Sequence, residues 1–544
     1  MVEKEITIEI KNPEILALVI ILLVFFVSEL NVTFNNPIVF GDEGFHARIA
    51  QLISKNVEYY VWSPVHYTKL TKEGFSRPPL LNILIASFLL LFGGSEALIN
   101  FLIPFMAFLT GSSAFFLGKE LYNKETGFIT AIIAGSIPAF VTYSVLIYTD
   151  ILVTLFITLF FLFFVLGIKR EKTVYFIISG VFGAFTFLTK TSGIAVYMFF
   201  FLAFLYQIIL KRKYNLIKKY FILFIVMTII LTPYFLRNLY YYKTPICDFP
   251  YAGKFFDISG CSVREYEEEY KYEEEPQQVG TEQSVYRLGI TNYLNFAYGG
   301  LDVLGIRFPW VILGVFSGLF ILLSKKRMDD VFVLLMLSIF LLIFYYAPGR
   351  AEDVARYTLA WTPFIALLAG KWFSEIYEFI KKYQKYLALI VFAVVIVLSY
   401  LNLQSKLDVM AQVKQFSPLF FEASDWIKEN LPEDVTLSTI WGHRAVYTTE
   451  RNAIGRIPDI YLSRDETYTR DIAKKLGVTH LFIQKFSISD QNIAEHYRLD
   501  SIQFFEDNPE TFIKVYENGP PLEQCLQQGG CDGNIIYEIN YDTS

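Results

Sequence analysis

Long apolar segments recur through the first 400 residues of the chain. A run of about 20 apolar residues, folded as a helix, spans the roughly 30 Å hydrocarbon core of a bilayer. Eleven segments are candidates, at 13–30, 97–118, 126–147, 150–168, 173–190, 193–210, 220–236, 303–323, 329–346, 357–371 and 385–402. The pattern predicts a polytopic α-helical membrane protein, with a transmembrane domain over residues 1–402.

The apolar segment 79–92 is too short to be an obvious span, because runs of 10–14 residues are more often interfacial. If it does not cross and the amino terminus lies inside, every basic cluster in a short loop faces the cytoplasm, as the positive-inside rule requires. These clusters are Lys119/Lys124, Lys169/Arg170/Lys172, Lys211/Arg212/Lys213/Lys218/Lys219, Lys325/Lys326/Arg327 and Lys371/Lys381/Lys382/Lys385. Counting 79–92 as a crossing inverts all of them. We therefore predict about eleven transmembrane helices, an interfacial segment 79–92, and a carboxyl terminus outside.

Three regions then lie outside: loops 31–96 and 237–302, and the tail 403–544. The tail is polar and mixed in pattern. It predicts helices at 423–430 and 465–476 and strands at 435–440, 478–484, 512–516 and 535–539, the last two as a pair. We expect a small extracytoplasmic α/β domain.

The composition agrees with this topology. Of 544 residues, 54% are hydrophobic and only 18% are charged, and the mean hydropathy is +0.40, which excludes an ordinary soluble protein. The net charge of −6 says little, because the two signs are segregated by side of the membrane. No cleavable signal pattern precedes the first span, which we expect to be retained. The predicted location is the cell (plasma) membrane, and no feature indicates a nucleic-acid partner.

All four cysteines fall in the predicted outer regions, two in the second loop and two in the tail. Two close pairs outside, and none in the cytoplasmic loops, predict the disulfides Cys247–Cys261 and Cys525–Cys531. Four free thiols in a reducing host are the alternative.

The predicted topology puts a set of ionisable residues at the outer face of the membrane. Asp42, Glu43, His46 and Arg48 lie in the first loop, Arg77 precedes two prolines, Asp150 starts one span, Lys190 ends another, and Arg350, Glu352, Asp353 and Arg356 precede a later span. Ionisable groups at membrane depth are costly and are usually functional or paired. Carboxylates could activate a hydroxyl or hold a metal, whereas Arg and Lys could hold a phosphate. Asp150 could also cap its helix, and Lys190 could simply extend to the interface.

An ordered set of motifs resembles the GT-C superfamily of glycosyltransferases, in the branch of protein O-mannosyltransferases and lipid A aminoarabinose transferases. The motifs are Asp42-Glu43, Arg77-Pro78-Pro79-Leu80, Gly93-Gly94-Ser95-Glu96, Gly118-Lys119-Glu120-Leu121-Tyr122, Phe187-Leu188-Thr189-Lys190 and Arg356-Tyr357 before Pro363. The resemblance covers roughly residues 13–372. It implies a monosaccharide donor linked to a polyprenyl phosphate, either dolichyl or undecaprenyl, and transfer with inversion to an acceptor hydroxyl on the outer face.

The resemblance also implies roles for individual residues. Asp42 would be the catalytic base, and Glu43 would bind the acceptor or assist. Arg77, Arg356 and Lys190 would bind the donor phosphate, although the position of Arg77 is often lysine in the aminoarabinose branch. Asp150 would support the site, together with Arg48 and His46 from the first loop.

The chemistry needs no nucleotide, and the sequence has no Walker A motif and no GxGxxG opening a helix. A divalent metal is possible, since His46 and His66 share a loop with Asp42 and Glu43, but no DxD motif supports it at 149–152, so the cofactor stays unknown. The acceptor could be a protein, a glycan or a lipid.

Two alternatives remain. An oligosaccharyltransferase catalytic subunit would carry a WWDYG motif, which Thr439-Ile440-Trp441-Gly442-His443 replaces here. A transporter or flippase for lipid-linked sugars would show an internal repeat and charges near mid-membrane. Neither feature is apparent.

Overall fold

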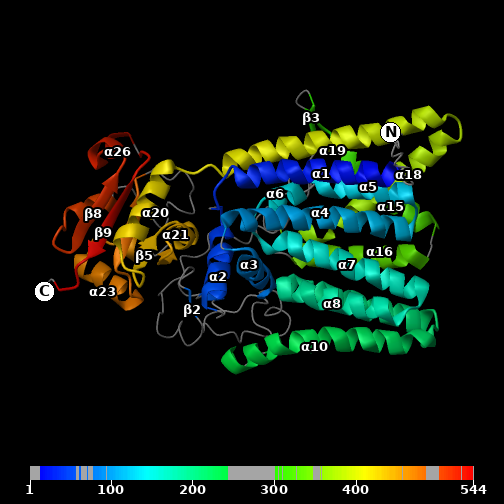
Figure 1. The fold of residues 1–544 in the computed structure, drawn as a ribbon, viewed down its shortest axis with the longest axis horizontal. Helices are drawn as coiled ribbons and strands as arrows, with labels where there is room; N and C mark the ends of the chain where they lie inside the picture. The colour runs from blue at the N-terminus through cyan, green and yellow to red at the C-terminus, as the bar shows by residue number, and fades with distance from the viewer. Residues whose placement is uncertain are drawn as a thin grey trace, which may run out of the picture.

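The computed structural model describes most of the chain as a helical bundle followed by an α/β domain (Figure 1). The described residues are 13–38, 40–56, 61–62, 70–71, 78–93, 95–242, 245, 301–303, 306–308, 310–325, 328–346, 356, 358–455, 458–485, 501–528 and 530–542. The bundle helices are α1 (Pro13–Phe34), α4 (Glu96–Leu121), α5 (Lys124–Ser136), α6 (Pro138–Ser144), α7 (Thr149–Arg170), α8 (Thr173–Thr189), α9 (Ile194–Leu205), α10 (Ile217–Tyr242), α15 (Trp310–Lys325), α16 (Met328–Tyr346), α18 (Thr362–Lys381) and α19 (Lys385–Val413).

Every predicted span overlaps a helix, but fewer of these helices are long and apolar enough to cross a membrane alone. Within the described residues six pass, or seven if α5 and α6, bent by 64°, form one broken span. The protein is therefore a multi-pass membrane protein with six to seven clear candidate spans, where the sequence predicted about eleven. The difference comes from helices such as α8, which are apolar but short.

Three predicted boundaries need correction. The segment predicted to begin at residue 303 starts as a short hairpin of β3 (Leu301–Val303) and β4 (Ile306–Phe308), and the helix begins only at Trp310. Helix α18 begins at Thr362, where Pro363 can occupy its first turn, and continues ten residues beyond 371. Helix α19 runs on to Val413, so the predicted domain boundary at residues 402 and 403 falls inside it.

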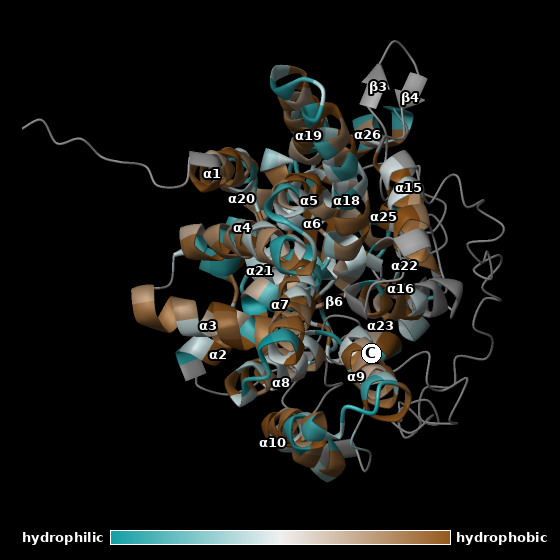
Figure 2. Cartoon of the chain, turned by 90° about the vertical axis from the view of Figure 1, so that its right-hand side faces the viewer, coloured by the Kyte–Doolittle hydropathy of each residue, from teal (hydrophilic) through white to brown (hydrophobic). Residues whose placement is uncertain are grey.

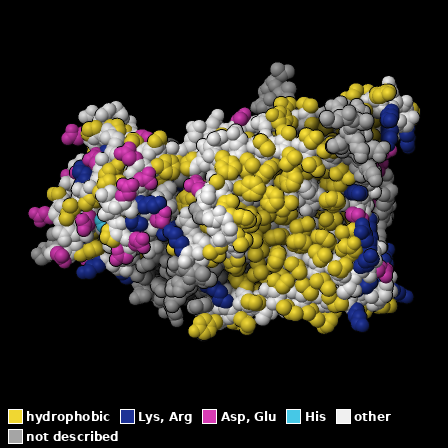
Figure 3. Space-filling view, viewed as in Figure 1, with side chains coloured by type: hydrophobic (Ala, Val, Ile, Leu, Met, Phe, Trp, Pro, Cys, Tyr) yellow, Lys and Arg dark blue, Asp and Glu magenta, His cyan; other side chains and the backbone are white. Residues whose placement is uncertain are grey.

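Basic side chains gather at the end of the bundle opposite the α/β domain, beyond an apolar belt (Figure 3). Arg170, at the end of α7, pairs with Glu120, at the end of α4, at 2.9 Å, and Lys219 of α10 donates to the carbonyl of Glu171 at 2.6 Å. These contacts place several predicted cytoplasmic loops side by side. That this end faces the cytoplasm remains a prediction.

Two helices lie across the other end of the bundle. They are α2 (Glu43–Asn56) and the 13-residue α3 (Leu80–Phe92), which pack against each other (Figures 1 and 2). Since α3 does not run along the bundle, the segment 79–92 is placed as expected for one that does not cross. The short strands β1 (Val61–Trp62) and β2 (Leu70–Thr71) pair between them.

The carboxyl-terminal domain contains a mixed five-stranded sheet in the order β6-β5-β7-β9-β8. Its strands are β5 (Thr436–Thr439), β6 (Asn452–Gly455), β7 (His480–Gln484), β8 (Phe512–Asn518) and β9 (Asn534–Ile539). Its helices are α20 (Pro418–Asn430), α21 (Gly442–Thr448), α22 (Pro458–Leu462), α23 (Glu466–Leu476), α25 (Ser501–Glu506) and α26 (Leu522–Gln528). The α/β class and the late strand pair, β8 with β9, are confirmed. Strand β6 and helix α21 were not predicted.

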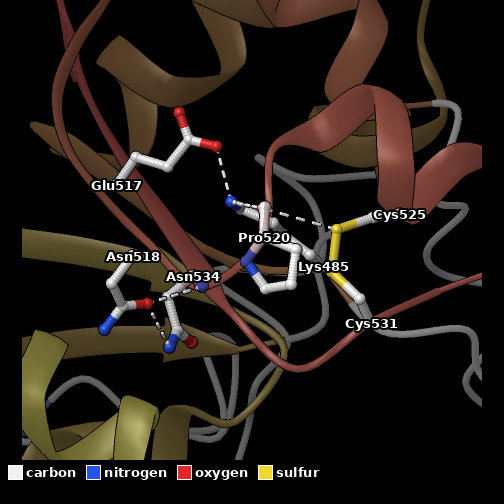
Figure 4. The surroundings of a disulfide bond; sticks show 7 residues. All are labelled: Lys485, Glu517, Asn518, Pro520, Cys525, Cys531 and Asn534. Atoms are coloured by element: carbon white, nitrogen blue, oxygen red, sulfur yellow. Dashed lines mark hydrogen bonds and ion pairs between the residues drawn. A yellow bond between two sulfur atoms is a disulfide. The ribbon is translucent and has the colours of Figure 1, made fainter.

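The disulfide Cys525–Cys531 is present and closes a small loop after α26 (Figure 4). Beside it, the buried ammonium of Lys485 donates to the carbonyl of Pro520 and pairs with Glu517. This confirms one of the two predicted bridges. Cys247 and Cys261 lie outside the described residues.

Candidate functional site

The loop that carries Asp42 is shaped by a glycine. Gly41 has φ +52°, and a Cβ there would lie 2.0 Å from the hydroxyl of Tyr148, so only glycine fits. That hydroxyl accepts a hydrogen bond from the Asp42 backbone amide at 3.0 Å. Burial, followed by the charge of Asp42, raises the pKa of Tyr148 well above its ordinary value, so the hydroxyl stays protonated. Asp42 is therefore held at a fixed place just before α2.

Each oxygen of the Asp42 carboxylate lies within ion-pair distance of a basic side chain. Oδ2 lies 3.4 Å from Nη2 of Arg356, and Oδ1 lies 3.2 Å from Nδ1 of His443. The side chain is 18% exposed. It is thus held between the bundle and the carboxyl-terminal domain, yet it remains accessible from outside.

A second carboxylate organises the basic residues. Asp150, fully buried at the start of α7, accepts from Lys190 Nζ on Oδ1 at 2.6 Å and from Arg356 Nε on Oδ2 at 3.0 Å. The Arg356 guanidinium also stacks on the ring of Tyr148, 4.5 Å from its centroid. Arg356 therefore bridges the two carboxylates, and four residues predicted for the site are joined in one network: Asp42, Asp150, Lys190 and Arg356.

Glu43 points away from this network. It is completely buried and pairs with Lys414 at 3.0 Å, and its two carboxylate oxygens also accept from the amides of Ile147 (3.0 Å) and Phe40 (3.0 Å). Lys414, at the end of α19, further donates to the carbonyl of Val145. Glu43 therefore joins the Asp42 loop, the α6–α7 connection and α19, which suits a positioning residue better than one that touches an acceptor.

The two other residues of the first loop lie farther along α2. His46 is buried, with Nδ1 2.8 Å from Oδ1 of Asn82 on α3. Arg48 donates to the carbonyl of Glu450 at 2.8 Å and pairs with its carboxylate at 3.4 Å. His46 thus holds α2 to α3, and Arg48 holds α2 to the carboxyl-terminal domain.

Several predicted residues lie outside the described part of the chain: Arg77, His66, Arg350, Glu352 and Asp353. Within the described ranges, no cluster of three or more His, Cys, Asp or Glu side chains could hold a metal ion.

Three residues that the sequence did not single out complete the surroundings of Asp42 and Glu43. Tyr148 and Lys414 pack against the loop, and His443 reaches it from the carboxyl-terminal domain. Tyr148 lies two residues before Asp150, and that proximity was the one available signal. Lys414 and His443 are about 370 and 400 residues away in the chain, and no pattern links them to the loop.

Comparisons with known proteins bear on the family and the fold. Residues 76–236 match the family model described as dolichyl-phosphate-mannose-protein mannosyltransferase. No curated protein sequence matches the chain.

Solved structures share the fold over nearly the whole chain. ArnT from Cupriavidus metallidurans, solved with undecaprenyl phosphate, matches with TM-score 0.61 and 11% identity over 98% of this chain and 99% of its own. The oligosaccharyltransferase AglB from Archaeoglobus fulgidus matches in its apo form with TM-score 0.67 and 13% identity over 95% and 81%. A complex of AglB with an inhibitory peptide and a dolichol-phosphate matches with TM-score 0.63 and 14% identity over 97% and 75%.

Proposed function

We propose that this chain, a membrane glycosyltransferase of the GT-C superfamily, moves one monosaccharide from a polyprenyl phosphate to an acceptor hydroxyl on the outer face of the cell membrane. One observation carries the proposal: a partly exposed carboxylate, Asp42, is joined through Arg356 to the buried carboxylate of Asp150, which also binds Lys190. This geometry supports a base for the acceptor beside positive groups for a phosphate.

The proposed reaction is a single displacement. Asp42 removes the proton from the acceptor hydroxyl, whose oxygen forms the new bond to C1 of the sugar. The bond from C1 to the phosphate oxygen breaks on the opposite face, and its electron pair leaves with the polyprenyl phosphate, which inverts the anomeric centre. A positioned base contributes about 10²- to 10⁴-fold in rate. Fixed positive charge at the leaving phosphate contributes further.

Arg356 and Lys190 are proposed to hold the donor phosphate, together with Arg77. Asp150 sets the spacing of the first two, because each of its carboxylate oxygens binds one of them. An arginine suits this position because its planar group can contact Asp150, Asp42 and a phosphate oxygen from different nitrogens. In this scheme Glu43, His46 and Arg48 position the Asp42 loop.

The donor would carry a dolichyl or an undecaprenyl chain. ArnT was solved with undecaprenyl phosphate and AglB with a dolichol-phosphate, and this chain shares their fold. The acceptor would be a hydroxyl of a protein, a glycan or a lipid. The carboxyl-terminal domain, which contacts the Asp42 loop, is placed to take part in its choice.

Transfer of a whole oligosaccharide is the second candidate, because the fold resembles AglB with the higher TM-score. Against it, ArnT and this chain cover each other almost completely, whereas this chain covers only 81% of AglB. Lipid-linked oligosaccharides and single sugars offered in parallel would separate the two candidates.

The direct test uses purified protein in detergent, a panel of radiolabelled polyprenyl-phosphate sugars, and membrane extract as the source of acceptor. We expect one donor to be consumed and its label to appear in a product that can then be identified. No sealed vesicle is present, so a transporter for lipid-linked sugars would leave every donor intact. Intact donors across the panel would contradict the proposed function.

The variant Arg356→Lys tests the proposed phosphate contact. Lysine keeps the charge but cannot contact Asp42 and Asp150 from separate nitrogens or stack flat on Tyr148. We expect kcat/KM for the donor to fall about tenfold or more, since one charge-assisted hydrogen bond contributes about 1.5–3 kcal/mol.

A matched control lies at the opposite end of the bundle. Arg170 likewise pairs with a carboxylate, that of Glu120, and lies over a tyrosine ring, that of Tyr175. Arg170→Lys should leave transfer unchanged. Equal effects of the two substitutions would mean that Arg356 has only a structural role.

A further inference from the structure

The carboxyl-terminal domain contacts the helical bundle beside Asp42. Helix α21 packs against α2. The ring of His443 meets that of Phe45 edge-on, with centroids 4.3 Å apart. A Cβ on Gly44 would lie 2.2 Å from the backbone carbonyl oxygen of His443. The sequence Asp42-Glu43-Gly44 is therefore fitted to the backbone of one particular residue of the other domain.

At this contact the imidazole of His443 faces the Asp42 carboxylate, with Nδ1 3.2 Å from Oδ1. The pair is an ion-pair contact by its distance and does not have the geometry of a hydrogen bond. An ionised carboxylate can only accept hydrogen bonds, so the contact is favourable when Nδ1 carries the hydrogen. The imidazole side chain is 32% exposed, so water reaches part of the ring.

We propose that His443 is a positioning residue for Asp42: its imidazole, 3.2 Å from the carboxylate, fixes the carboxylate toward the acceptor, and the charge of the imidazole controls how readily Asp42 takes the acceptor proton. The inference rests on the proposed function, in which Asp42 is the base. It gives the carboxyl-terminal domain a part in the catalytic centre, beyond any part in acceptor choice.

The other charged groups described along this contact have partners of their own. On the bundle side, Arg356 shares the Asp42 carboxylate. On α21 itself, Arg444 lies over the rings of Trp441 (4.0 Å) and Phe416 (4.3 Å), and the hydroxyl of Tyr447 bonds to Glu96. Lys414 pairs with Glu43, and Glu450, two residues past α21, takes Arg48, Lys55 and Lys428. Asp42 forms an ion pair with His443.

The two protonation states of His443 have opposite effects on the reaction. A neutral imidazole leaves the negative charge of the carboxylate available to the acceptor proton. An imidazolium favours the carboxylate over the carboxylic acid and so opposes uptake of that proton. After transfer, Asp42 returns the proton to solvent. The rate should therefore fall when the imidazole is protonated at low pH.

Three variants separate orientation, charge and packing. His443→Ala removes the polar contact to the carboxylate and should lower kcat about ten- to a hundredfold, the rate equivalent of one polar contact to a charged group. His443→Asn places an amide N–H near the position of Nδ1 without an ionisable ring. It should recover most of the lost rate at neutral pH and flatten the dependence of the rate on pH. The control His480→Asn, on strand β7, should keep the wild-type profile, because its recorded hydrogen bond goes to Thr479.

Two outcomes would overturn the inference. One is a wild-type rate and pH profile in His443→Ala. The other is an equal loss in His443→Ala and His443→Asn with the profile unchanged, which is the signature of a packing role.

A measurement without substrate keeps the inference separate from the proposed function. Thermal unfolding of Asp42→Asn, His443→Ala and the double variant should give shifts in Tm that do not add, as expected for residues in contact. Additive shifts in Tm would show that Asp42 and His443 do not interact, and would refute the inference whatever the transfer assay shows. If the wild type consumes no donor, the proposed function is refuted, but the Tm values of the three variants still test whether the two residues interact.

Discussion

Asp42→Asn is expected to abolish sugar transfer while leaving the protein folded. The amide has nearly the same shape as the carboxylate, and its one oxygen can still accept from Arg356, but it cannot take a proton from an acceptor. We expect the rate to fall by about 10²- to 10⁴-fold, which is the usual contribution of a general base. The measurement is donor consumption by purified protein in detergent, with Tm recorded on the same sample.

Asp425→Asn is the matched control, because it makes the same change at an exposed position on α20. It should keep both the wild-type rate and the wild-type Tm. Near-normal turnover in Asp42→Asn would refute the assignment of the base. A large fall in Tm would instead point to a structural role for the carboxylate.

The second large effect is expected on stability, at the pair of Glu43 and Lys414. Both side chains are at most 1% exposed, and their atoms lie 3.0 Å apart. Lys414→Met would leave the Glu43 carboxylate buried without its counter-ion. Removing one partner of a buried ion pair typically costs about 3–5 kcal/mol. We therefore expect a large fall in Tm and a loss of activity that follows the loss of folded protein.

The double variant Glu43→Gln/Lys414→Met separates this effect from simple loss of packing. With the carboxylate also removed, no unpaired charge is left buried, and much of the lost stability should return. The side-chain amide introduced by Glu43→Gln can still accept a hydrogen bond from a backbone N–H group, that of Phe40 or Ile147. A double variant no more stable than Lys414→Met would show that the ion pair is not what Lys414 contributes.

The sequence predicted the bundle well because each membrane-spanning helix must be a continuous run of apolar residues, which can be read directly along the chain. Each predicted span overlaps a helix, and α3 was separated from the spans by its length and by the charges of the loops. The boundaries were less certain. The start of α15 and the end of α19 depend on contacts of polar backbone at the ends of the bundle, which hydropathy does not record. A resemblance to this glycosyltransferase family was also predicted, from an ordered set of short motifs, and the family-model match over residues 76–236 confirms that resemblance.

The sequence predicted only those parts of the site that follow from the membrane topology. The predicted number of membrane crossings put Asp42, Asp150, Lys190 and Arg356 at one end of the bundle, and the structure joins them. The topology could not show that the side chain of Glu43, next to Asp42, points away from the site and forms a buried ion pair with Lys414. Nor could it predict His443 or Lys414, because the docking of a separate domain depends on the fit of two surfaces. Gly44 allows the two surfaces to meet closely, but the need for glycine there is seen only in the structure, where the His443 carbonyl oxygen packs against it.

The long sequence separation between Asp42 and His443 has a consequence for how the protein is made. During synthesis the loop that holds Asp42 emerges early, and about 400 further residues must follow before α21 exists. Domains generally fold as units in the order of synthesis. A nascent chain would thus form the network of Asp150, Lys190 and Arg356 before the Asp42 carboxylate is held from both sides. An incomplete chain would lack one wall of the proposed site.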